Sequence, residues 1–90
     1  MRLILYSKPG CHLCEGLQEK LEQIRGLSLE LEVRDITSRE DWFQRYQYEV
    51  PVLCRSRFDR EEPLPRPSPR LSVRQLEQML QNYLPTDEAK

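Results

Sequence analysis

The chain has 90 residues, a formal net charge of −1 at pH 7, and acidic and basic residues interspersed along its length. The length is that of one domain, and the charge balance argues against binding to nucleic acid. No hydrophobic run is long enough to span a membrane, and the apolar run at the N-terminus is too short for a signal peptide. We therefore expect a soluble cytoplasmic domain that binds neither nucleic acid nor a membrane.

The first motif lies between a predicted strand and a predicted helix. Residues 3–6 are all apolar, which is typical of a central strand that is covered on both faces. Pro9 and Gly10 then supply a turn, and a helix follows that we expect to end at Gly26. Its apolar stripe consists of Leu13, Leu17, Leu21 and Ile24.

Cys11 and Cys14 form a Cys-x-x-Cys motif at the start of this helix. Unpaired backbone N–H groups and the positive end of the helix dipole favour the reactive thiolate there. Cys11, at the exposed tip, would attack a disulfide, and Cys14, one turn inside, would resolve the mixed disulfide. His12 would face solvent or substrate and, when protonated, stabilise the neighbouring thiolate.

Two other interpretations of the motif stay open. Cysteines one turn apart also occur as small buried apolar residues, and Cys-x-x-Cys is half of many zinc sites. A zinc site needs a second pair of ligands, and beyond the motif the chain offers only Cys54 and His12. The strand–turn–helix context favours redox chemistry, so we predict no metal site and read Cys54 as a buried core thiol.

The middle of the chain predicts a second strand and a second helix. Residues 29–34 alternate apolar and charged side chains, which suits a strand at the edge of a sheet, parallel to the first strand. Ser38 and Asp41 predict a capping box for the helix. Trp42 and Phe43 lie at helical spacing, and we expect both to belong to the core.

A third strand is predicted to begin at Pro51, because a proline at the first position of a strand removes only one hydrogen-bond donor. We expect the Val50–Pro51 bond to be cis and to lie against Cys11. Residues 55–62 are charged and turn-like, and four prolines in residues 63–69 permit a short edge strand near Pro63–Arg66 and then an extended connector.

The last predicted element is a helix that begins with a capping box of Ser72 and Gln75 and ends at Pro85. The chain therefore divides into a single domain over residues 1–85 and a polar tail over residues 86–90. Its predicted order is strand, helix, strand, helix, strand, short edge strand, helix.

This order, the segment from Tyr6 to Glu15 and the later Val50–Pro51 pair resemble the glutaredoxin-like proteins of the thioredoxin superfamily. The resemblance implies an α/β fold of the glutaredoxin type, β-α-β-α-β-β-α. Its four-stranded mixed sheet would have the first and third helices on one face and the second helix on the other.

The resemblance also implies a thiol–disulfide oxidoreductase with Cys11 as nucleophile and Cys14 as resolving thiol. The Val50 backbone would pair with an extended substrate segment. Lys8 matches a basic residue of glutaredoxins that favours the thiolate or binds a glutathione carboxylate. The residues expected to bind substrate are Lys8, His12, Leu13, Val50 and Pro51.

The chain departs from the glutaredoxins at two places. His12-Leu13 stands where they carry Pro-Tyr, and Pro67–Arg70 stands where they carry a Gly-Gly turn and an acidic residue. We expect no bound cofactor, with glutathione left open as a co-substrate. The expected partners of a monomer are protein or small-molecule disulfides and a reductant, either glutathione or a thioredoxin-reductase-type system. The alternatives are a redox-inactive binding module and a metal or iron–sulfur carrier.

Overall fold

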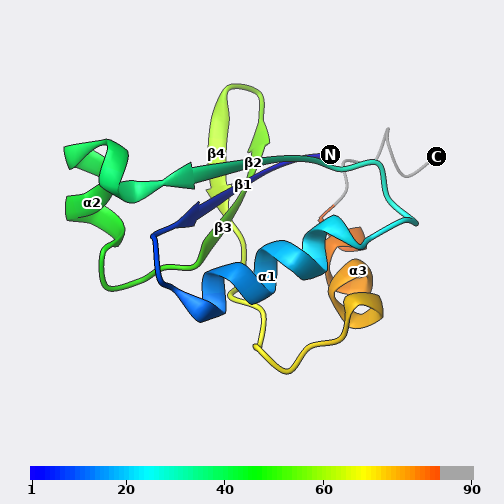
Figure 1. The fold of residues 1–90 in the computed structure, drawn as a ribbon. Coiled ribbons are helices and arrows are strands. Elements are labelled where there is room, and N and C mark those ends of the chain that lie inside the picture. Colours follow the sequence, from blue (N-terminus) through cyan, green and yellow to red (C-terminus); the bar gives the residue numbers. More distant parts are fainter. Residues whose placement is uncertain (84–90) are drawn as a thin grey trace.

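The structure, a computed structural model, describes residues 1–83. The first half of the chain contains β1 (Arg2–Ser7), α1 (His12–Glu22), β2 (Glu30–Asp35), the 3₁₀ turn η1 (Ile36–Ser38) and α2 (Glu40–Tyr46). The second half contains β3 (Val52–Arg57), β4 (Arg60–Pro63) and α3 (Val73–Gln81). The four strands form one sheet in the order β2-β1-β3-β4, with β1 parallel to β2 and antiparallel to β3 (Figure 1). The predicted order of elements and the mixed sheet are confirmed.

Strand β1 is buried on both of its faces. Leu3 and Leu5 pack on one face with apolar residues of α1 and α3, and Ile4 and Tyr6 pack on the other face with residues of α2. Burial of a large apolar side chain stabilises a fold by about 1.5–3 kcal/mol, so this short strand anchors both helical layers. The predicted placement of the three helices on the two faces is confirmed.

The aromatic residues of α2 cover the second face unequally. Tyr46 is buried and lies 4.4 Å from Tyr6, centroid to centroid. Trp42 meets the Tyr6 ring edge-on at 5.7 Å. Trp42 and Phe43 are only half-buried, so they border this core and do not fill it as predicted.

The predicted start of α2 is wrong. Ser38 and Asp41 form no capping box, because the Ser38 hydroxyl donates instead to the Asp35 carbonyl (2.7 Å) within η1. Helix α2 begins after Arg39, which has no capping side chain and pairs with Asp41 (2.9 Å). By contrast, the predicted capping box of α3 is present in both directions.

Helix α1 also ends earlier than predicted. Its last residue is Glu22, and the Gln23 N–H closes the final turn by donating to Lys20 O (3.1 Å). Gly26 serves a different purpose, because its N–H donates to the Glu77 carboxylate of α3 (3.1 Å). A Cβ at this position would lie 2.6 Å from that carboxylate, so a larger residue here would have to move the Glu77 side chain.

A hairpin replaces the predicted charged turn at residues 55–62. Strands β3 and β4 are antiparallel neighbours. The turn between them consists of Phe58 and Asp59, both at positive φ (52° and 61°). Arg55 of β3 and Glu62 of β4 pair across the hairpin at 3.1 Å. The charged residues therefore occupy an edge hairpin, and the edge strand lies before rather than after Pro63.

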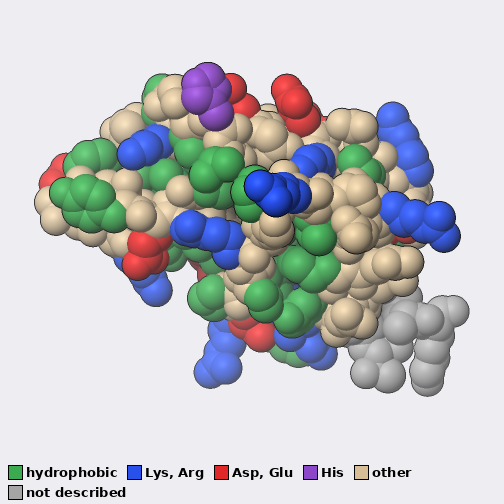
Figure 2. Space-filling model, turned by 90° about the horizontal axis from the view of Figure 1, so that it is seen from below, with side chains coloured by type: hydrophobic (Ala, Val, Ile, Leu, Met, Phe, Trp, Pro, Cys, Tyr) green, Lys and Arg blue, Asp and Glu red, His purple; other side chains and the backbone are tan. Residues whose placement is uncertain are grey.

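The proline-rich segment, residues 64–72, connects β4 to α3 without a helix or strand, as predicted. It runs along the lower side of Figure 1, where the Lys20 ammonium of α1 donates to Pro69 O (2.7 Å). Figure 2 shows the molecule from this side, with Lys and Arg side chains lying among hydrophobic ones. Helix α3 ends at Gln81, ahead of the predicted end at Pro85. Pro85 and the predicted tail lie outside the described residues.

A charged network joins the sheet strands beneath α2. The buried Tyr6 hydroxyl donates to Glu61, and Arg34 donates to both the Tyr6 hydroxyl (2.8 Å) and Glu61 (3.0 Å). The bond from Tyr6 lowers the pKa of the Glu61 carboxyl, and burial raises the pKa of Tyr6. The network thus connects β1, β2 and β4.

We expect Glu61→Gln to make folding less sensitive to acid. A carboxylate with a lowered pKa in the folded state stabilises that state above its unfolded pKa of about 4.3 and loses this contribution as the pH falls through the lowered value. Urea unfolding at about pH 7 and about pH 3 should show a smaller difference for Glu61→Gln than for the unchanged protein. Glu30→Gln, on an exposed carboxylate, should keep the original difference; equal pH dependence in Glu61→Gln would contradict the assignment.

We expect Gly16→Ala to stabilise the fold by about 0.8–1.0 kcal/mol, the difference between the two residues in a helix interior. Gly16 lies inside α1, and a Cβ there meets no heavy atom within 4 Å. Urea unfolding measures the gain. Destabilisation would mean that an added methyl group is not accommodated.

Candidate active site

Strand β1 leads directly into the start of α1, where Cys11 lies. Gly10 adopts a positive φ of 76° in the connecting turn, and the Cys11 N–H closes the turn by donating to Lys8 O (3.3 Å). Cys11 is the N-cap of α1, a position at which the first helical N–H groups need acceptors. The predicted location of Cys11 at the helix start is confirmed.

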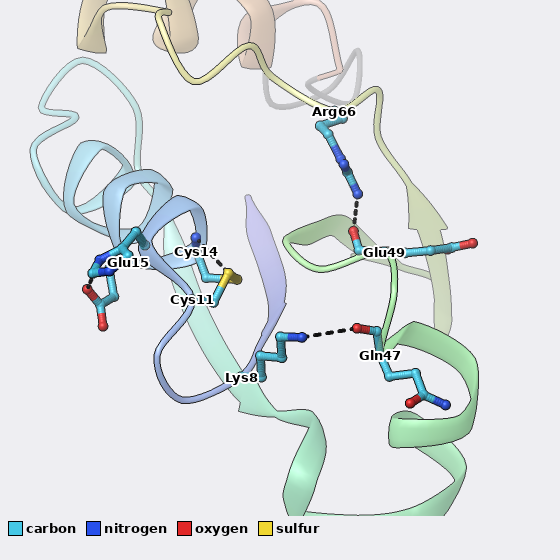
Figure 3. Close-up of a disulfide and its surroundings, with 8 residues drawn as sticks. Lys8, Cys11, Cys14, Glu15, Gln47, Glu49 and Arg66 are labelled. Carbon is cyan, nitrogen blue, oxygen red and sulfur yellow. Dashed lines mark hydrogen bonds and ion pairs between the residues drawn. A yellow bond between two sulfur atoms is a disulfide. The ribbon is translucent and has the colours of Figure 1, made fainter.

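The two cysteines of the motif are joined in a disulfide, with their Cα atoms 5.3 Å apart (Figure 3). The Cys14 N–H donates to Cys11 Sγ (3.2 Å), so the sulfur acts as the capping acceptor. Cys14 is 2 % exposed, whereas Cys11 is half-buried. One sulfur is therefore accessible at the helix tip and the other is enclosed beneath it.

Two basic residues, Lys8 and His12, flank Cys11 in the chain. Lys8 Nζ donates to Gln47 O (3.3 Å) in the loop that leads to β3 (Figure 3). The His12 side chain is 95 % exposed, and its Nδ1 lies 3.8 Å from a carboxylate oxygen of Glu15. The orientation of His12 toward solvent agrees with the sequence prediction.

The Val50–Pro51 peptide bond is cis, as expected. Pro51, His12 and Leu13 line one pocket, so the structure brings these three predicted residues together. The contact of Pro51 with Cys11 stays a prediction. Leu13 is 54 % exposed, and its predicted place in the core stripe of α1 is wrong. It lies instead in the first turn of α1, between His12 and Cys14, with its side chain exposed.

Val50 does not offer its whole backbone as predicted. Its N–H already donates to Tyr46 O (3.1 Å) at the end of α2, so pairing with a substrate through this donor is not available. Arg66 of the proline-rich segment donates to the neighbouring Glu49 carbonyl and was not identified from the sequence (Figure 3). The contact spans 17 positions, and the proline spacing that dominates this segment gives no signal for it.

Cys54 is separate from the motif. It is 1 % exposed and lies with Ile4, Tyr6 and Tyr46 in the core beneath α2, which confirms its reading as a core thiol. Burial raises the pKa of this thiol, so the reactive thiolate is disfavoured. Within residues 1–83 no group of three or more His, Cys, Asp or Glu side chains is arranged to hold a metal ion. No helix in this range has the length and apolar character to cross a membrane.

Comparison with known proteins agrees with this geometry. The X-ray structure of a structural-genomics target protein, XcR50 from X. campestris, superposes with a TM-score of 0.60 at 29 % identity, over 92 % of this chain and 99 % of that one. Thioredoxin 1 from Thermosipho africanus superposes with a TM-score of 0.65 at 17 % identity, over 92 % and 93 % of the two chains. No curated protein sequence matches the chain. The family described as Glutaredoxin-like domain (DUF836) matches residues 2–81, and the chain belongs to this glutaredoxin-like family of thioredoxin fold.

Proposed function

We propose that the protein is a thiol–disulfide oxidoreductase that reduces protein or small-molecule disulfides through a mixed-disulfide intermediate. One observation carries the proposal. Cys11 Sγ caps α1, accepts the Cys14 N–H and is bonded to the enclosed Cys14 sulfur. A backbone N–H and a helix start both stabilise negative charge on Cys11 once the disulfide is reduced.

The reaction begins from the reduced dithiol. The Cys11 thiolate attacks one sulfur of the substrate disulfide; a Cys11–substrate S–S bond forms, and the substrate S–S bond breaks to release a thiolate, which takes up a proton. Cys14 then loses its proton and attacks Cys11 Sγ. This step forms the Cys11–Cys14 disulfide and releases the second substrate thiol, so two electrons pass from the dithiol to the substrate. The disulfide state described above is the product of this half-reaction.

The surroundings of the dithiol supply the proposed substrate contacts. Lys8 precedes the turn to Cys11 and His12 follows the cysteine directly, so both are near it along the chain. Leu13 and Pro51 supply apolar lining to the pocket that His12 borders. Val50 would contribute its carbonyl oxygen alone, because its N–H is occupied. A second thiol compound must return the disulfide to the dithiol, and we propose glutathione or a thioredoxin-reductase-type system for this step. Recycling assays with each reductant distinguish the two.

We expect Cys14→Ser to accumulate mixed disulfides and Cys11→Ser to lose disulfide reduction to the uncatalysed background. Only the accessible thiolate can attack, and only the second thiol can release the bound substrate. Insulin reduction and mass spectrometry of the trapped adducts measure the two effects. Cys54→Ser is the matched control and should keep the original rate.

Other outcomes of this experiment favour the alternative functions. Equal residual activity in the two variants would contradict the assigned roles. Absence of reduction by the unchanged protein with either reductant would favour a redox-inactive binding module. Iron or zinc in protein purified without oxygen, lost in Cys11→Ser, would favour a metal or iron–sulfur carrier.

We expect alkylation of the reduced, folded protein at neutral pH to label Cys11 first and Cys54 last. Cys11 lies at the helix tip, whereas Cys54 is enclosed and its raised pKa leaves little thiolate. Timed iodoacetamide labelling followed by peptide mass spectrometry gives the order. Cys54 should react only on unfolding in urea, and labelling of Cys54 ahead of Cys11 would refute the role assignment.

A further inference from the structure

An apolar pocket lies at the junction of α1 and the proline-rich segment, and its lining includes His12 and Leu13, the two residues between the cysteines of the motif. Its volume is about 170 Å³. An apolar cavity of about 150 Å³ holds a benzene molecule, so this pocket has room for one leucine-sized or phenylalanine-sized side chain. Its apolar lining includes Leu13, Leu17, Pro51, Pro67 and Leu71.

Gly16 forms part of the pocket wall on α1. Glycine weakens a helix interior, and here no close neighbour requires it, because an added Cβ would meet nothing within 4 Å. Packing of the fold therefore does not explain this glycine. It does keep this part of the pocket wall open, and a side chain as large as leucine would occupy the space.

Two cations, Lys20 and Arg66, border the pocket, and none of the described residues that line it is Asp or Glu. Lys20 donates to Pro69 O and Arg66 donates to Glu49 O, so both bind neutral backbone carbonyls. Within residues 1–83 neither forms an ion pair with a carboxylate. Their charges remain to attract a negative ligand, in line with the Lys and Arg side chains seen among hydrophobic ones in Figure 2.

We propose that this pocket selects the substrate: it binds an apolar side chain next to the disulfide cysteine of a polypeptide segment that also carries acidic residues. That the bound segment carries a disulfide rests on the proposed function, whereas binding to the pocket is tested separately, without any reduction step. An apolar wall and a basic border match such a segment. They offer no carboxylate for the ammonium group of glutathione, so a protein segment fits this pocket better than that tripeptide.

The test uses fluorescent peptides in which Ser replaces the substrate cysteine, so that binding is measured without disulfide exchange. The first peptide carries Leu beside this Ser and Glu residues around it; a second carries Lys for Glu, and a third carries Ser for Leu. Fluorescence anisotropy with the oxidised protein should show tightest binding for the first. We expect a loss of about twofold to fivefold for each reversed charge, diminishing at high salt, and of at least fivefold for removal of Leu.

Two variants test the residues themselves. Gly16→Leu should fill the pocket and abolish the preference for the Leu peptide over the Ser peptide, whereas Gly16→Ala, which adds one methyl group, should retain most of it. Arg66→Gln should reduce the preference for the Glu peptide over the Lys peptide by about twofold to fivefold. Arg74→Gln removes an exposed charge of α3 away from the pocket and is the matched control. Thermal unfolding verifies that each variant is folded.

Equal binding of the Glu and Lys peptides, or an unchanged preference for Leu in folded Gly16→Leu, would overturn the proposal. Tighter binding of glutathione than of the Leu–Glu peptide, lost in Gly16→Leu, would overturn it as well. The expected peptide preferences without any disulfide reduction would support the pocket and overturn the proposed function. Disulfide reduction without the peptide preferences would support the proposed function and overturn the role of the pocket.

Discussion

Burial of β1 on both faces is the constraint on which the rest of the structure depends. The alternation of Leu3 and Leu5 with Ile4 and Tyr6 attaches one helical layer to each side of the sheet. Parallel pairing with β2 on one side and antiparallel pairing with β3 on the other then place β1 in the interior of the sheet. Because this strand ends just before the turn to Cys11, the turn that carries the cysteine starts from a buried interior strand of the sheet.

The two sulfurs of the Cys11–Cys14 disulfide lie in different surroundings. Cys14 is held in the first turn of α1 and is enclosed, so its position is set by the helix. Cys11 lies at the cap, where its sulfur takes the place that a serine or aspartate oxygen fills in other helices. An acceptor at this position lowers the energy of the helix start, and the same contact stabilises charge on sulfur when the bond to Cys14 opens. The hydrogen bond from the Cys14 N–H to Cys11 Sγ therefore stabilises the helix start and also favours the Cys11 thiolate.

Local patterns in the sequence predict the parts of the fold that depend on neighbouring residues. The apolar run of β1, the Cys-x-x-Cys turn and the capping box of Ser72 and Gln75 are of this kind, and the structure contains all three. The turn-like segment 55–62 was predicted, but not the hairpin turn at Phe58 and Asp59. Aspartate tolerates positive φ, whereas phenylalanine rarely adopts it, and pairing of the flanking strands imposes it here.

Contacts between distant residues were the other source of error. Gly26 precedes its carboxylate partner by 51 positions, and Lys20 precedes Pro69 by 49. No spacing rule covers such distances, so the sequence indicated the dithiol but not the basic border of the pocket beside it. The Val50 N–H was misjudged for a different, local reason, because it bonds the Tyr46 carbonyl four residues earlier at the end of α2.

Both outer strands of the sheet carry charged side chains. On β2, Glu32 forms an ion pair with Arg2 of β1 (2.6 Å). On β4, Glu62 forms an ion pair with Arg55 of β3 (3.1 Å). A strand from a second molecule could add to either edge only by burying or displacing such pairs, and β4 ends in a proline that donates no ladder hydrogen bond. The sheet is thereby protected from growing into larger assemblies at high concentration. Under the proposed function, substrate chains are captured at the dithiol, and the two edges of the sheet stay closed to them.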